Sequence, residues 1–356
     1  MKDNGKQLMN DTRKISRGMV FRVIGGLCLA IFLLSFPHIF TSNYLRNLAI
    51  LTCMWAIGGQ AWNVLSGYGS RYSMGHAIFF GLGAYSSAVL FTKYGISPWI
   101  GMIIGMLVSS SISVIVGFPT FKLTPAYYGM ATLGFTFTLQ AVFLNWRWVG
   151  DSRGVFMPLL RKSSILDFQF ANNKTQYYYI VLFLLVLSYL LVYKVSKSKL
   201  GFYIRAMKED ELAAQSLGVD VMKNLQIVGI ISASLASVAG TFYAQYMLYV
   251  DPMSVYNSIT SNNFILSATL GGIATIAGPL IGAIIFIPTG ELIRGWIGGS
   301  GKAFDQMLWG FVIILIAIYR PSGILGWFKE HAKFFSGISK WMKEPIVRSN
   351  HDNSRM

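Results

Sequence analysis

The composition of this chain excludes an ordinary soluble domain. Of its 356 residues, 54% are apolar and only 12% are charged, and the mean hydropathy is +0.51, whereas about a quarter of the residues in a soluble domain are charged. The net charge of +16 does not indicate binding to nucleic acid, because the basic residues lie at the ends of apolar segments rather than among stacking aromatic residues. The sequence is therefore that of an all-α integral membrane protein in contact with lipid.

The apolar segments predict about ten transmembrane helices, because each is close to the ~20 residues that a helix needs to cross a bilayer. In chain order they cover residues 18–40, 45–66, 76–92, 98–118, 126–147, 177–194, 224–249, 261–276, 278–296 and 304–320. The first segment follows a basic start, but it is too long for a signal peptide and lacks a small-residue cleavage site. We therefore expect it to remain as the first span. Cys28 and Cys53 lie inside apolar segments, where packing is their expected role.

The basic residues place both termini in the cytoplasm. Six Lys and Arg residues lie in the N-terminal arm up to Arg22, six lie between Lys194 and Lys223, and seven lie from Arg320 onward. Cytoplasmic segments carry the excess of Lys and Arg, and these three share a face only if an even number of spans separates them. The predicted organisation is a cytoplasmic arm (1–17), a transmembrane domain (18–326) with a cytoplasmic loop (195–223), and a basic cytoplasmic tail (327–356). Residues 148–176 and 250–260 then lie outside.

Glycine-rich interruptions in both halves of the chain predict broken helices. Gly69 and Gly75 follow the second span, and Gly272 and Gly278 separate the eighth span from the ninth. Interrupted helices at corresponding positions of two halves are typical of a transport path.

Polar side chains inside spans are costly unless they face protein or water, so they mark candidate positions along such a path. They are Gln60 and Asn63 in the second span, and Thr132, Thr136 and Gln140 on one face of the fifth. The alternative is that the threonines bond to their own helix and that the glutamines pack between helices. His76, at the start of the third span, is expected to be structural rather than a proton carrier.

The loop 195–223 is a charged soluble element inside a membrane domain. Residues 204–217 are good helix formers, and Gly218 follows where a left-handed helix stop is expected. The sequence therefore predicts one short helix at the membrane face, with Ala213 and Ala214 forming a small surface for a partner. The alternative is an ordinary amphipathic connector. No phosphate-binding G-x-x-x-x-G-K-[ST] motif occurs, so ATP hydrolysis would require another subunit.

The motifs of this loop resemble those of the permease subunits of bacterial branched-chain amino acid ABC importers, of the LivM type. The matching loop residues are Gly201, Arg205, Ala206, Glu209, Asp210, Glu211, Ala213, Ala214 and Gly218. Further matches lie at residues 63–68, 73–77, 80–85, 145–146, 271–272, 278–279, 291–294 and 320–326, so that the resemblance covers about 60–326.

The resemblance implies a ten-span fold similar to that of the type II, vitamin B12-type importer permeases, in agreement with the count of spans. It also implies a second homologous permease, two ATP-binding cassette subunits that dock on the loop, and an extracytoplasmic solute-binding protein. ATP and magnesium would then be held by the partner subunits, and this chain would bind no cofactor or metal. In span five the family's Glu and Arg are replaced by Phe137 and Gln140. A branched-chain amino acid is favoured, and another amino acid, urea or a short amide remains open.

Two other classes of protein fit the sequence less well. An ion-coupled secondary transporter usually needs an acidic or basic residue within the membrane, but Glu291 and Asp305 lie near the ends of spans. A membrane enzyme needs a cluster of catalytic side chains, and the four histidines are scattered along the chain. The sequence therefore predicts a non-catalytic, multi-pass permease of the bacterial inner membrane.

Overall fold

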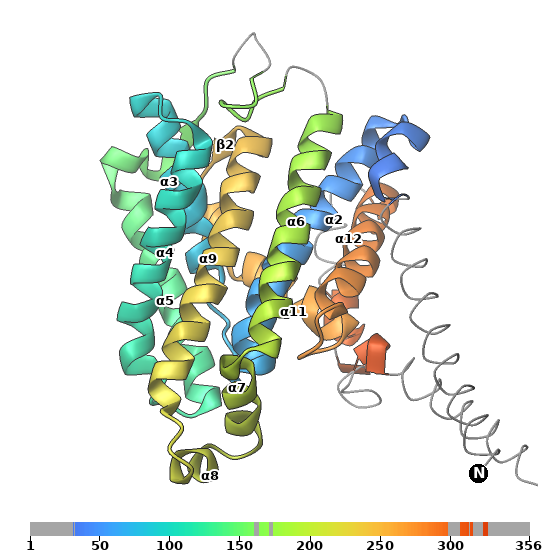
Figure 1. Ribbon diagram of the computed structural model, residues 1–356. Coiled ribbons are helices and arrows are strands. Elements are labelled where there is room, and N and C mark those ends of the chain that lie inside the picture. The colour runs from blue at the N-terminus through green and yellow to red at the C-terminus, as the bar shows by residue number, and fades with distance from the viewer. Residues whose placement is uncertain are drawn as a thin grey trace, which may run out of the picture.

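The computed structural model describes residues 31, 33–159, 164–170, 174–297, 307–312, 314–315 and 323–326. They form a bundle of long helices, with the short helices α7 (Lys199–Glu209) and α8 (Glu211–Ser216) at one end and strand β2 (Tyr249–Val250) near the other (Figure 1). The predicted arm 1–17, the tail 327–356 and parts of the predicted spans 18–40 and 304–320 lie outside the described residues.

The predicted spans between residues 45 and 296 each fall on a helix. These helices are α2 (Asn43–Trp62), α3 (Ala77–Tyr94), α4 (Pro98–Thr120), α5 (Pro125–Asn145), α6 (Lys174–Lys197), α9 (Val221–Met247), α11 (Ser258–Gly271) and α12 (Gly278–Ile297). The π-helix η1 (Asn63–Tyr68) continues α2, the 3-10 turns η2 (Arg147–Val149) and η3 (Asp151–Arg153) follow α5, and the short helix α10 (Pro252–Val255) precedes α11. Strand β1 (Val155–Phe156) pairs antiparallel with β2, with Val155 opposite Val250.

Four helices in the described part of the chain are long and apolar enough to cross a membrane: α2 with η1, α4, α6 and α9. By contrast, α11 has 14 residues and rises about 21 Å, which is less than the roughly 30 Å of a bilayer interior. The helix of the predicted eighth span, 261–276, therefore ends earlier than we predicted, at Gly271, and residues 272–277 are non-helical.

The positions of the helices follow from their surfaces. Helices α2 and α9 are mostly buried within the bundle, whereas only a third of the apolar part of α4 and of α6 is buried. The exposed faces of α4 and α6 are apolar, as shown by Leu107, Ile115 and Phe183, and such faces are suited to lipid. Helix α9 is fixed to α3 by small and polar residues. The Thr241 hydroxyl donates to the Gly83 carbonyl at 3.0 Å, as is common where helices pack within membranes.

Candidate functional site

The second predicted helix break contacts the π-helix η1, which leads into the first break. The Asn63 amide nitrogen donates to the carbonyl of Thr275 at 2.8 Å, and its oxygen accepts from the backbone N–H of Ala274, also at 2.8 Å. Asn63 is fully buried. It therefore bridges η1 and the connection between α11 and α12, instead of presenting its amide to a solute as we predicted from the sequence.

The four predicted break glycines lie at these two interruptions. Gly69 ends η1 with an ordinary negative φ, whereas Gly272 follows α11 with a φ of +132°. Position 75 requires a glycine because the backbone of α5 passes close to it, and an added Cβ would lie 2.3 Å from the carbonyl oxygen of Thr132. A Cβ at Gly278 would lie 2.2 Å from the carbonyl oxygen of Gly272. The breaks at 69–76 and 272–277 are therefore tightly packed structures.

The predicted polar side chains of α5 form hydrogen bonds within that helix and to neighbouring segments. Thr132 is buried, donates to the Gly129 carbonyl at 2.9 Å and accepts from the Met74 N–H at 3.1 Å. Thr136 is also buried and donates to the Thr132 carbonyl at 3.0 Å. Gln140 reaches the Pro252 carbonyl at 3.5 Å. The two threonines bond to their own helix, which is the alternative that the sequence left open.

Two further polar groups lie in the interior of the bundle. Within the described residues, neither the amide nitrogen nor the amide oxygen of the fully buried Gln60 side chain has a hydrogen-bond partner. The ring nitrogens of His76 lie 2.9 Å from the Ser73 hydroxyl and 2.7 Å from the Ser232 hydroxyl. His76 is therefore a buried, bonded group, as expected from the sequence.

A cavity of about 670 Å³ lies between the first break and the last helices. Tyr72 and Met74 of the 69–76 segment form part of its wall. Its polar lining comes mainly from the start of α11 and from α12, namely Asn257, Ser258, Asn262, Asn263 and Arg294. The volume lies in the usual range of small-molecule sites.

The asparagines of this cavity are unsuited to contact with lipid. Asn262 is exposed and Asn263 is half-buried on α11, and an amide in hydrocarbon without partners is costly. These side chains therefore require water or another polypeptide beside them. The sequence signal was the polar run 261–263 inside an apolar segment, which our sequence analysis did not use.

The loop 195–223 forms two helices, where the sequence predicted one. Helix α7 ends at Glu209, and Asp210 adopts an extended conformation with φ −155° and ψ 115°. The Asp210 carboxylate accepts from the N–H groups of Leu212 at 2.8 Å and Ala213 at 3.0 Å. This is the geometry of an N-cap, which begins a new helix. Gly218 has a φ of +84°, which confirms the predicted left-handed stop.

The surface that the loop presents to solvent differs from the predicted alanine pair. Ala214 is only 3% exposed and packs within the chain, so the prediction that it contacts a partner is wrong, while Ala213 is exposed. The large apolar side chains of Leu212 and Leu217 are 75% and 85% exposed. Arg205 is exposed, lies over the ring of Phe202 and donates to the Ser196 carbonyl at 3.2 Å. Glu209 is exposed at the end of α7.

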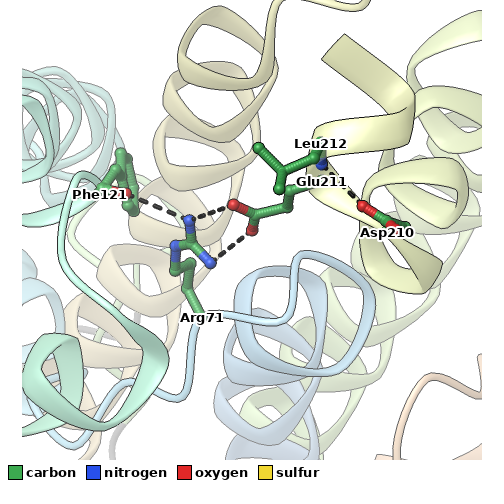
Figure 2. Close-up of polar contacts among 5 residues, drawn as sticks. All are labelled: Arg71, Phe121, Asp210, Glu211 and Leu212. Carbon is green, nitrogen blue, oxygen red and sulfur yellow. Dashed lines mark hydrogen bonds and ion pairs between the residues drawn. The ribbon is translucent and has the colours of Figure 1, made fainter. Parts of the chain in front are cut away.

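Two side-chain links attach this loop to the first break. The Arg71 guanidinium donates to both carboxylate oxygens of Glu211, at 2.6 and 3.1 Å, and to the Phe121 carbonyl at 3.2 Å (Figure 2). The Lys208 ammonium donates to the Gly67 carbonyl at 2.9 Å. Arg71 was not among the residues predicted from the sequence, because an arginine in a short connection between apolar spans ordinarily indicates only which side of the membrane the connection lies on.

The opposite end of the bundle carries an exposed ion pair. The Arg153 guanidinium donates to the Asp151 carboxylate at 2.9 Å, and these hydrogen bonds lower the pKa of the Asp151 carboxyl below its ordinary value. The pair is therefore present at neutral pH and is lost only as the pH falls through that lowered pKa.

A family profile described as "Branched-chain amino acid transport system / permease component" matches residues 44–317. The chain belongs to this family. It is thus the permease component of a branched-chain amino acid ABC transport system and not an enzyme. The matched range includes both helix breaks, the polar cavity and the loop of α7 and α8.

Several LivM permease proteins are similar to this chain. The branched-chain amino acid transport permease proteins LivM of Salmonella typhimurium and of Escherichia coli K12 are each 26% identical over 318 residues, which is 83% of this chain and 73% of the relative. A probable LivM of Methanocaldococcus jannaschii is 24% identical, over 80% of this chain and 85% of the relative. The LivH permease protein of Escherichia coli K12 is 28% identical over 148 residues, or 42% of this chain. No solved structure matches the chain at a significant level.

Proposed function

We propose that this permease forms one half of the membrane path of a bacterial importer, which moves branched-chain amino acids or related solutes into the cytoplasm. Two separate ATP-binding cassette subunits hold ATP and magnesium and dock on the loop 195–223, while this chain binds no nucleotide. The docking is supported by the exposure of Leu212 on α8 and of Leu217, which directly follows that helix. Exposed apolar groups on a short helix outside the spanning helices are suited to contact with a protein partner.

The orientation of the chain in the membrane follows from its proposed role as an importer permease. The permease domain 18–326 crosses the inner membrane about ten times, as in type II importer permeases, and both termini lie in the cytoplasm with the loop 195–223. In support, α7 and α8 lie at the opposite end of the bundle from β2 (Figure 1). An extracytoplasmic binding protein delivers the solute to the β2 end.

A second homologous permease completes the path. The support comes from the cavity beside α11, whose exposed asparagine would otherwise face lipid. The chain is similar to both LivM and LivH permease proteins of Escherichia coli, which fits a pair of related permeases. A solute with an ammonium and a carboxylate group would find amide partners in Asn257 and Asn263, near Arg294, which is paired with Glu291 at 2.9 Å.

Affinity purification of the tagged permease from its membrane, with mass spectrometry, tests the docking. We expect ATPase subunits to co-purify with the natural chain and to be lost from Leu212→Asp, because a carboxylate would be buried without a partner in the interface. The matched control is Leu159→Asp. Leu159 is 76% exposed and lies in the loop at the other end of the bundle. Equal recovery of the ATPase with both variants would contradict the docking site, and no ATPase with the natural chain would contradict the function.

A further inference from the structure

Arg71 is a buried cation whose partners come from two other parts of the chain. Its side chain is 5% exposed, and a buried guanidinium is tolerated only when it is paired and hydrogen-bonded. The carboxylate comes from Glu211 at the start of α8, and a carbonyl comes from Phe121 after α4 (Figure 2). Arg71 itself belongs to the break after η1. The ion pair therefore joins the loop of α7 and α8 to the first break.

The segment that follows Arg71 leads directly to the cavity. Tyr72 and Met74 are on the cavity wall. The backbone between them is held by the indole N–H of Trp62, which donates to the Ser73 carbonyl at 2.7 Å, and by Thr132, which accepts from the Met74 N–H at 3.1 Å. A segment with fixed backbone contacts moves as a unit, and rigid elements of this kind carry coupling between distant sites.

The second link ends on the same part of the chain. Lys208 of α7 donates to the Gly67 carbonyl at 2.9 Å, and Gly67 lies four positions before Arg71. Both helices of the loop are thus attached to the 67–76 segment, one through a backbone carbonyl and the other through a bidentate ion pair. The bidentate pair fixes direction as well as distance, so it is the link better suited to transmit a displacement.

We propose that Arg71 is a positioning residue through which movement of α8 changes the wall of the cavity. When an ATPase subunit displaces α8, Glu211 carries Arg71 with it, and Tyr72 and Met74 shift relative to the asparagines of α11. The proposal rests on the proposed function, since it needs an ATPase docked on the loop. In this proposal the ion pair between Arg71 and Glu211 transmits the movement of the docked ATPase to the wall of the cavity.

The test measures the cavity wall directly, in the complete transporter reconstituted in vesicles. Met74→Cys is introduced in a Cys28→Ser, Cys53→Ala background, and its rate of modification by a small maleimide is compared without nucleotide and after trapping with ATP and vanadate. We expect the rate to differ by roughly fivefold or more, the lower end of ordinary coupling factors. In Arg71→Gln this difference should be lost while the ATPase still co-purifies and basal ATP hydrolysis continues. In Glu211→Gln the difference should be lost in those complexes that retain the ATPase.

The double variant and a control separate transmission from damage to the fold. If the two residues act through one link, Arg71→Gln with Glu211→Gln should be no worse than the poorer single variant. The control Arg153→Gln removes the exposed ion pair at the other end and should leave the labelling difference unchanged. If Arg71→Gln does not fold, the test relies on Glu211→Gln, because the side chain of Glu211 is 35% exposed and its replacement disturbs the fold less.

Three results would overturn the proposal. The first is a labelling rate of Met74→Cys, in the chain with Arg71 and Glu211 intact, that does not respond to trapping. The others are single variants that keep the full response, or a double variant whose loss is the product of the single losses. A natural complex that takes up no solute or holds no ATPase would instead contradict the proposed function. The two failures are therefore distinguishable by the co-purification and uptake of the unmodified transporter.

Discussion

Gly218 provides a direct test of whether the geometry of the loop matters for transport. Its φ is +84°, and no atom lies within 4 Å of an added Cβ. Gly218→Ala therefore introduces backbone strain without a steric clash. The penalty for a left-handed L-residue is about 1–2 kcal/mol, which disfavours the observed loop relative to relaxed alternatives by a factor of about 5 to 30.

The strain would be relieved by turning φ negative at residue 218. That rotation displaces Val219, whose N–H donates to the Ala214 carbonyl at 3.1 Å, and with it Asp220, which caps α9 through the Lys223 N–H. The orientation of α8 relative to α9 would change. We expect solute uptake by reconstituted transporter to fall by up to the same factor, with normal amounts of permease in the membrane.

Gly95→Ala is the matched control. Gly95 also has a positive φ, +64°, with nothing within 4 Å of an added Cβ, but it ends α3 rather than α8. The strain is the same and the location differs, so uptake by Gly95→Ala should stay close to that of the natural chain. Normal uptake by Gly218→Ala, or an equal fall in both variants, would refute the reasoning.

Three further predictions concern the interior, the cavity and the topology. Asn63→Leu leaves the half-buried Ala274 N–H without its partner, at a cost of up to about 1–3 kcal/mol, so the melting temperature in detergent should fall, and an unchanged value would show that the bridge is dispensable. Asn263→Leu should reduce uptake without reducing ATPase recovery, because it removes an amide from the cavity wall, and normal uptake would exclude Asn263 from the path. An impermeant maleimide added outside intact cells should modify Leu166→Cys but not Leu212→Cys, and the reverse pattern would overturn the orientation.

The helices were predictable because apolar length is a property of each segment alone. The stop at Gly218 was predictable for a similar reason, since a glycine after a run of helix formers acts locally. The break at Asp210 is also local, but helix propensity and the N-cap compete at that residue. Helix propensity predicted one continuous helix, whereas the hydrogen bonds from the N–H groups of Leu212 and Ala213 to the Asp210 carboxylate begin a second helix.

The contacts between distant residues were not predictable from one sequence. The partner of Glu211 is 140 positions away, and no spacing rule connects them. The buried state of Ala214 has the same origin, because it depends on how α8 packs against the rest of the chain. The polar residues of α5 and η1 looked like a path from their spacing, but spacing cannot distinguish a side chain that faces water from one, such as Asn63, that is bonded to a backbone elsewhere.

The bridge made by Asn63 also has a consequence for biosynthesis. Its two partners lie more than 200 positions later, since Asn63 and Thr275 are 212 residues apart. At synthesis rates of about 5–20 residues per second, α2 waits roughly 10 to 40 s in the membrane before the connection between α11 and α12 leaves the ribosome. During that interval the amide of Asn63 lacks its final partners, so the insertion machinery or another helix must shelter it. A nascent chain arrested before residue 274 should therefore be a better substrate for membrane quality-control proteases than one arrested shortly after α12.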